Sequence, residues 1–103
     1  MDYQLVLQLR GDDCLDFEAM VSLEDEIQQI IAPIAEVDGH DVGCEEMNIF
    51  ILTHDPVASF ERIKPLLSAE ILLDKVGVAY RDLRSDYFTL LWPTSSTRAF
   101  VIA

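Results

Sequence analysis

The sequence predicts an α+β fold, a ferredoxin-like split βαβ antiparallel sheet with two main helices on one face and an extra C-terminal hairpin strand. Three observations predict it: apolar alternation over 3–9, apolar residues at three- and four-residue steps over 17–30 and 57–67, and an apolar run over 47–53. At 103 residues the chain has room for one hydrophobic core, so we predict a single domain over 1–103.

The first strand is predicted by a period of two, which places alternate side chains on opposite faces of a sheet. Gly11, followed by two aspartates, ends the strand. The face that carries the bulkier apolar groups consists of Tyr3, Leu5, Leu7 and Leu9.

The first helix is predicted by an apolar stripe with charged residues on the opposite side. Asp13 or Asp16 is expected to cap it, or Ser22 if the helix is shorter, and Pro33 closes it. The residues of the stripe are Phe17, Met20, Leu23, Ile27 and Ile30.

The next two strands flank a glycine-rich segment. Residues 34–43 are expected to form a short strand that enters a turn bracketed by Gly39 and Gly43. Residues 47–53 are apolar on both faces, which predicts a central strand covered on both sides.

The second helix is expected to begin with Asp55 as its cap and Pro56 at its first position. Pro65 should end or kink it near Lys64, because proline lacks the backbone donor and clashes with the preceding turn. The predicted buried stripe is Val57, Phe60, Ile63 and Leu67.

The C-terminal third is less regular. A short helical piece is expected over 68–75, with Ile71 and Leu72 facing inward. Residues 77–83 suit either a helix or a strand, and we favour a hairpin with the strand predicted over 87–92. A short edge strand is expected over 99–102.

In this plan the first and third strands are the central pair, and one face of the sheet stays open unless something covers it. Val6 and one face of each of the segments 49–53 and 88–92 would place apolar groups there. By fold analogy we expect a homodimer through this face.

Charge is distributed unevenly along the chain. Residues 1–55 hold fourteen acids and one base (−13), and residues 56–103 hold five acids and six bases (+1), which gives the net charge of −12. This disfavours nucleic acid and anionic membranes and favours a basic protein partner, although such charge also serves solubility. The partner-binding candidates are Asp12, Asp13, Glu24 and Glu26. The same residues are also explained as solvated charges near the start of a helix, where the helix dipole favours acids.

A polar segment over 38–55 carries the groups from which ligand and metal sites are built. The ligand-binding candidates are Asp38, His40, Asp41, Glu46 and His54. Of these, His40, Asp41 and His54 are the metal candidates, and a divalent ion such as zinc would suit the mixed set. No known ligand spacing is present, no catalytic residue is identified, and a solvated hairpin tip explains the same residues.

The expected cellular compartment follows from two features that the sequence lacks, a membrane-spanning segment and a secretion signal. No apolar run approaches the roughly 20 residues of a membrane span, and the first residues lack the pattern of a secretion signal. We therefore expect a cytoplasmic protein with Cys14 and Cys44 as thiols, a disulfide between them being the alternative.

The strings at 38–43 and 46–56, together with Leu91-Trp92-Pro93, resemble those of small bacterial proteins that have no assigned function. The resemblance implies a bacterial source and carries no catalytic role. The favoured function is an acidic interaction or regulatory module, for example an immunity or inhibitor protein acting on a basic partner. The alternatives are a metal- or ligand-binding protein, an enzyme, or a subunit of a larger complex.

Overall fold

A computed structural model describes residues 1–43, 45–94 and 100–102. They form a five-stranded antiparallel sheet with strand order β2-β3-β1-β4-β5, and two α-helices. The α+β class with an antiparallel sheet and two helices is therefore as predicted. In chain order the elements are β1 (Tyr3–Arg10), a 3₁₀ turn (Gly11–Asp13), α1 (Phe17–Ile31), β2 (Ala35–Gly43), β3 (Glu46–Thr53), α2 (Pro56–Ala69), β4 (Gly77–Asp82) and β5 (Thr89–Trp92).

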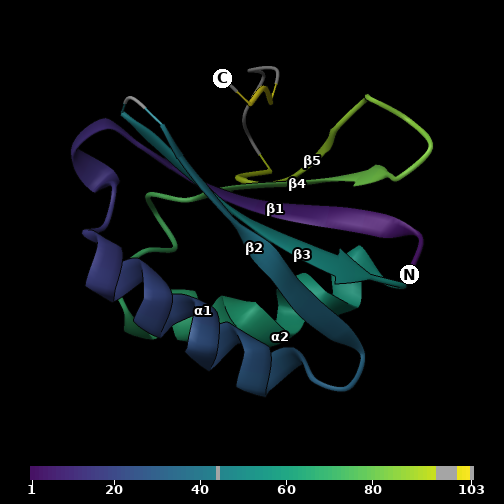
Figure 1. Ribbon diagram of the computed structural model, residues 1–103, viewed down its shortest axis with the longest axis horizontal. Helices are drawn as coiled ribbons and strands as arrows, with labels where there is room; N and C mark the ends of the chain where they lie inside the picture. The colour runs from purple at the N-terminus through teal and green to yellow at the C-terminus, as the bar shows by residue number, and fades with distance from the viewer. Residues whose placement is uncertain (44, 95–99, 103) are drawn as a thin grey trace.

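Both helices lie on one face of the sheet, and the hydrophobic core fills the space between the helices and the sheet (Figure 1). The strands β1 and β3 are direct neighbours, as predicted, with Leu5 opposite Ile51 and Leu7 opposite Ile49. These four side chains are almost completely buried. The alternation over the first strand thus has the expected physical origin, since one face of β1 packs against the helices.

The opposite face of the sheet, which we call the outer face, is partly covered by the chain itself. The segment that contains residues 100–102 lies on this side, away from the helices (Figure 1). The ring of Phe100 packs against Phe88 with 5.2 Å between ring centroids. Beneath, Val6 and Ala79 are paired across β1 and β4 and are completely buried. The apolar face that the sequence left open is therefore closed at its centre, and the homodimer stays a prediction.

The two helix starts agree with the sequence. Asp16 caps α1, its carboxylate accepting a hydrogen bond of 2.8 Å from the Ala19 amide. Asp55 caps α2 in the same way through the Ala58 amide at 3.0 Å, with Pro56 at the first helical position. Each cap satisfies an amide that the helix itself leaves without a partner.

The predicted glycine-bracketed turn is wrong, because β2 continues through it to Gly43. The pairing register with β3 shifts between Val37 and Gly39, which is a β-bulge. Gly39 has a φ of 132°, a conformation that residues with a Cβ rarely adopt. The glycine therefore absorbs the irregularity within the strand, and the ladder then resumes.

The second helix also differs from the prediction. It runs on past Pro65 to Ala69, because the buried Ile63 and Leu67 on either side hold it against the core while Pro65 faces solvent. Val57 is 51% exposed and does not belong to the buried stripe. Its place is taken by Ser59, whose hydroxyl lies 2.8 Å from that of Thr53.

After α2 the chain makes turns rather than the short helical piece that was predicted over 68–75. Ile71 has a positive φ and is 76% exposed, so its predicted inward orientation is wrong, whereas Leu72 is buried as expected. The hairpin favoured for residues 77–92 is present as the antiparallel pair β4 and β5. Residues 100–102 are not in a strand, contrary to the prediction, and Ala99 lies outside the described residues.

Among residues 1–43, 45–94 and 100–102, neither helix has the length and apolar composition needed to cross a membrane.

Candidate functional site

A groove of about 360 Å³ lies between the start of α1 and the end of β2. Two of its apolar side chains are well exposed: Phe17 is 65% exposed and Val42 is 59% exposed. Single exposed apolar side chains are ordinary, but two that line one groove with polar groups beside them mark a candidate surface for a partner. The lining residues are Leu15, Phe17, Met20, His40, Asp41 and Val42.

His40 joins the two walls of this groove. Its Nδ1 atom lies 2.8 Å from Oε1 of Glu24 on α1. Its ring packs edge-on against that of Phe17, with 5.9 Å between the ring centroids. The register places His40 opposite Ile49, whose side chain faces the helices, so His40 points toward α1. The contact orients the imidazole and anchors the end of β2 to the helix.

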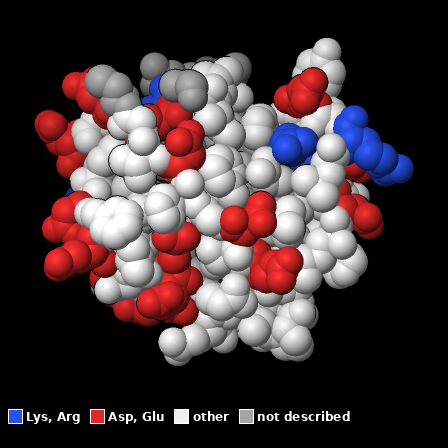
Figure 2. Space-filling view, in the orientation of Figure 1, with Lys and Arg blue, Asp and Glu red and all other residues white. Residues whose placement is uncertain are grey.

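The surroundings of the groove are strongly acidic. No Lys or Arg occurs between Arg10 and Arg62, and Figure 2 shows acidic side chains gathered over α1 and β2. In the same view the basic side chains lie mainly beside the hairpin of β4 and β5. The exposed acids of α1 and β2 are Glu18, Asp25, Glu26, Glu36, Asp38 and Asp41.

The structure brings together only part of the predicted ligand site. His40 and Asp41 line the groove, and Asp38 lies beside it at the bulge. His54 follows Thr53, which pairs with Ala35 at the opposite end of β2. The two histidines are therefore separated by more than half the length of that strand.

The proposed metal set does not converge in the part of the chain that the structure describes. No three His, Cys, Asp or Glu side chains there are grouped so that they could hold an ion. His40 and Asp41 are neighbours in β2 and point to opposite faces of the sheet, as adjacent residues of a strand do. Binding of zinc stays a prediction, and Cys44 lies outside the described residues.

Glu46 belongs to a different structure, a closed ring of four polar side chains on the outer face. Arg10 donates through Nε to Gln8 at 3.1 Å and contacts the Glu46 carboxylate at 3.2 Å. Gln8 donates to Asn48 at 3.0 Å, and Asn48 donates to Glu46 at 3.1 Å. Arg10 is the one Lys or Arg of the first 55 residues, and it is paired with Glu46. The acids of α1 and β2 therefore have no further Lys or Arg within residues 1–55 to neutralise them.

The partner-binding candidates are dispersed. Asp12 and Asp13 are exposed in the 3₁₀ turn before α1, and Glu26 is exposed on α1. Glu24 is occupied by His40. Within the part of the chain that the structure describes, Glu24 is the one residue of these four that is hydrogen-bonded to a groove residue.

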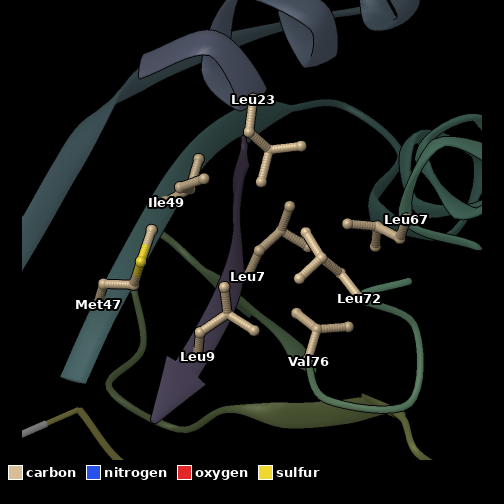
Figure 3. A pocket seen from close by; sticks show the side chains of 8 residues that line it. All are labelled: Leu7, Leu9, Leu23, Met47, Ile49, Leu67, Leu72 and Val76. Atoms are coloured by element: carbon tan, nitrogen blue, oxygen red, sulfur yellow. The ribbon is translucent and has the colours of Figure 1, made fainter. Parts of the chain in front are cut away.

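A second hollow, in the core, carries no binding function. It holds about 10 Å³ and is lined by side chains from both helices, the sheet and the turn after α2, all of them apolar (Figure 3). A space of that size is at the lower limit for one water molecule, and a water there would find no polar side chain among the lining residues. It is a packing defect between Leu7, Leu23 and Leu72 rather than a ligand pocket.

The sequence did not predict that Phe17 and Val42 are exposed and line a groove. Phe17 fits the apolar stripe of α1 by spacing, yet at the first position of the helix it lies beside the edge strand β2 and is largely exposed. The polar ring was also missed, although Asn48 within an apolar run and Gln8 within an alternating strand were visible signals. Buried polar side chains generally need partners, so such residues indicate a network.

Comparison of the chain with protein-family models, with curated proteins and with solved structures finds no match. The site must therefore be interpreted from its own chemistry.

Proposed function

We propose that the protein is an acidic interaction module that binds a basic segment of a partner protein over α1 and β2. The observation that carries the proposal is the groove between these elements, which combines exposed Phe17 and Val42 with two bordering elements, α1 and β2, that carry several exposed acids and no Lys or Arg of their own. Apolar contact supplies affinity, and the acidic surroundings select a cationic partner.

The charge arrangement supports selection rather than solubility alone. Acids serving solubility would be effective anywhere on the surface, whereas here they are concentrated over two elements that also border the groove (Figure 2). A field of one sign accelerates encounter with an oppositely charged protein and excludes acidic competitors. An inhibitor or immunity protein that covers the cationic cleft of an enzyme would use this arrangement. The proposal takes the protein to act in the cytoplasm.

We further propose that the fold is of the ferredoxin-like split βαβ plan, extended by β5 at one edge. The adjacency of β1 and β3 and the placement of both helices on one face support this assignment. The extension matters for function because it makes β5, and not β4, one edge of the sheet. The edge at β2 is unaffected by it.

The test uses two variants of equal charge. The first reverses exposed acids of α1 and β2 (Asp25→Lys, Asp38→Lys, Asp41→Lys), and the second reverses exposed acids elsewhere (Glu61→Lys, Asp74→Lys, Asp86→Lys). Binding of a fluorescent peptide of alternating lysine and valine is measured by anisotropy at low and high salt. We expect the first variant to bind about tenfold or more weakly than the second, and salt to weaken binding to the wild type.

Equal binding by the two variants would show that only net charge matters and would refute a site over α1 and β2. Absence of any binding at low salt would refute the interaction with a basic segment. Circular dichroism of both variants checks that the fold is retained.

A further inference from the structure

The outer edge of β2 is one of the two edges of the sheet. In an edge strand, alternate residues direct their backbone N–H and C=O groups away from the sheet, and such groups are ready to pair with another chain. At Val37 this position is already filled, because the Val37 amide donates a hydrogen bond of 2.8 Å to the side chain of Gln28 on α1. Directly before the bulge, the edge is therefore capped by the helix at Val37.

Beyond the bulge the edge is different. Residues 39–43 continue the ladder with β3 on their inner side, and within the described residues no hydrogen bond caps the outward backbone groups of His40 or Val42. All of residues 40–43 are exposed. The bulge thus separates the capped position at Val37 from an accessible stretch of β2, and this stretch borders the groove.

Charge decides between a second copy of the chain and a different partner. Two copies that paired their β2 edges would bring Asp38 and Asp41 of each close to the same acids of the other, and like charges across paired strands are destabilising. A strand that carries Lys or Arg would place opposite charges there. The edge therefore favours a basic partner over self-association.

We propose that an extended basic segment of a partner protein adds as a strand to the outer edge of β2 over residues 39–43. An apolar side chain of that segment enters the groove between Phe17 and Val42, and its Lys or Arg side chains meet Asp38 and Asp41. Backbone pairing supplies affinity in this mode, while the groove and the acids supply specificity. The inference rests on the proposed function and adds the conformation of the bound segment.

Backbone methylation separates this mode from charge attraction. Two further versions of the lysine–valine peptide carry N-methyl groups on alternate residues, one version on the lysines and the other on the valines. A peptide paired as an edge strand presents only one of these sets of amides to β2. We expect one version to bind about tenfold or more weakly than the parent, through lost ladder hydrogen bonds, and the other to keep most of the affinity.

Two pairs of matched variants locate the peptide. Phe17→Ala and Val42→Ala should weaken binding severalfold, whereas Tyr87→Ala and Val57→Ala, which remove exposed side chains elsewhere, should not. Hydrogen exchange of the complex should show slowed amides within residues 39–43. All four side chains are more than half exposed, so each variant is expected to fold.

The outcomes distinguish the two proposals. Salt-sensitive binding that both methylated peptides retain, or protection absent from residues 39–43, would overturn strand addition and leave the acidic interaction module intact. Binding of a folded basic protein but of no extended peptide would have the same meaning. If the wild type binds neither the parent peptide nor a folded basic protein, and the two charge-reversed variants behave alike, both strand addition and the acidic interaction module are refuted.

Discussion

The side-chain amide of Gln8 on β1 donates a hydrogen bond of 3.0 Å to Oδ1 of Asn48 on β3. This pair lies on the outer face, and Gln8 also donates to the carbonyl of Val101 at 2.9 Å. Arg10 reaches the same carbonyl at 3.3 Å. The polar ring therefore fixes the C-terminal segment to the sheet, in addition to joining the two central strands.

Replacing Asn48 should reveal what the ring contributes. Asn48 is 1% exposed, and Asn48→Ala leaves Gln8 and Glu46 each without one buried partner. We expect the free energy of unfolding to fall by about 1–3 kcal/mol, measured by urea denaturation. Thr89→Ala, an exposed polar site on β5, should change it by less than about 0.5 kcal/mol. Similar effects for the two would mean that the ring adds nothing beyond ordinary surface contacts.

The same substitution at two phenylalanines tests the covering of the outer face. Phe100 is half-buried against Phe88, whereas Phe17 is largely exposed at the groove. Phe100→Ala should lower the free energy of unfolding by about 1–2 kcal/mol, and Phe17→Ala by less than about 0.5 kcal/mol. If Phe100→Ala is as mild as Phe17→Ala, residues 100–102 do not stabilise the sheet.

The thiol of Cys14 should react slowly. Burial raises its pKa above the ordinary value, and the carboxylate of Asp13 adds to the rise, while a backbone hydrogen bond from Met47 opposes it. Less thiolate is then present at neutral pH, and the thiolate is the reactive form. In a Cys44→Ser background, alkylation by iodoacetamide should be slower than that of a free cysteine and should accelerate in urea. A rate equal to that of free cysteine would contradict this.

Asp82 offers a measurement of pH dependence. Hydrogen bonds from the side chain and the backbone of Arg84 lower its carboxyl pKa to about 2. A carboxyl whose pKa is lower when folded stabilises the fold above its unfolded pKa and loses that contribution as the pH falls toward 2. Because both groups are exposed, the effect on stability is small. Carboxyl NMR titration should place Asp82 near 2, and Arg84→Gln should move it back toward its ordinary value; an unchanged titration in the variant would exclude Arg84 as the cause.

Particular residues show why sequence patterns succeeded in some places and failed in others. Asp55 and Pro56 predicted a helix start correctly because capping depends on neighbours within one turn. Pro65 was predicted to end or kink the helix near Lys64, and the predicted end is wrong because the packing of Ile63 and Leu67 outweighs one lost hydrogen bond. Local chemistry is read from the chain directly, whereas its competition with tertiary packing is not.

The candidate site shows the same division. His40 and Asp41 were selected from the sequence and do line the groove, but His54, selected with them, lies at the other end of β2. Proximity along the chain is a poor guide to proximity in a sheet, where each residue adds about 3.3 Å along the strand. Phe17 was assigned to the core because helical spacing does not reveal where the covering sheet ends.

The amino-acid sequence alone determined the α+β class, the Asp55 cap of the second helix, the central place of residues 47–53 and the concentration of acids in the first half. Periodicity, capping and composition act locally or additively, so they can be read from the chain. For the first helix the sequence offered three caps, and the structure decided for Asp16. Only the tertiary structure decided that β2 is an edge capped by Gln28 at Val37, that Phe17 and Val42 form a groove, and that Gln8, Arg10, Glu46 and Asn48 close a ring. Those features join residues up to forty positions apart, and strand pairing is what brings them together.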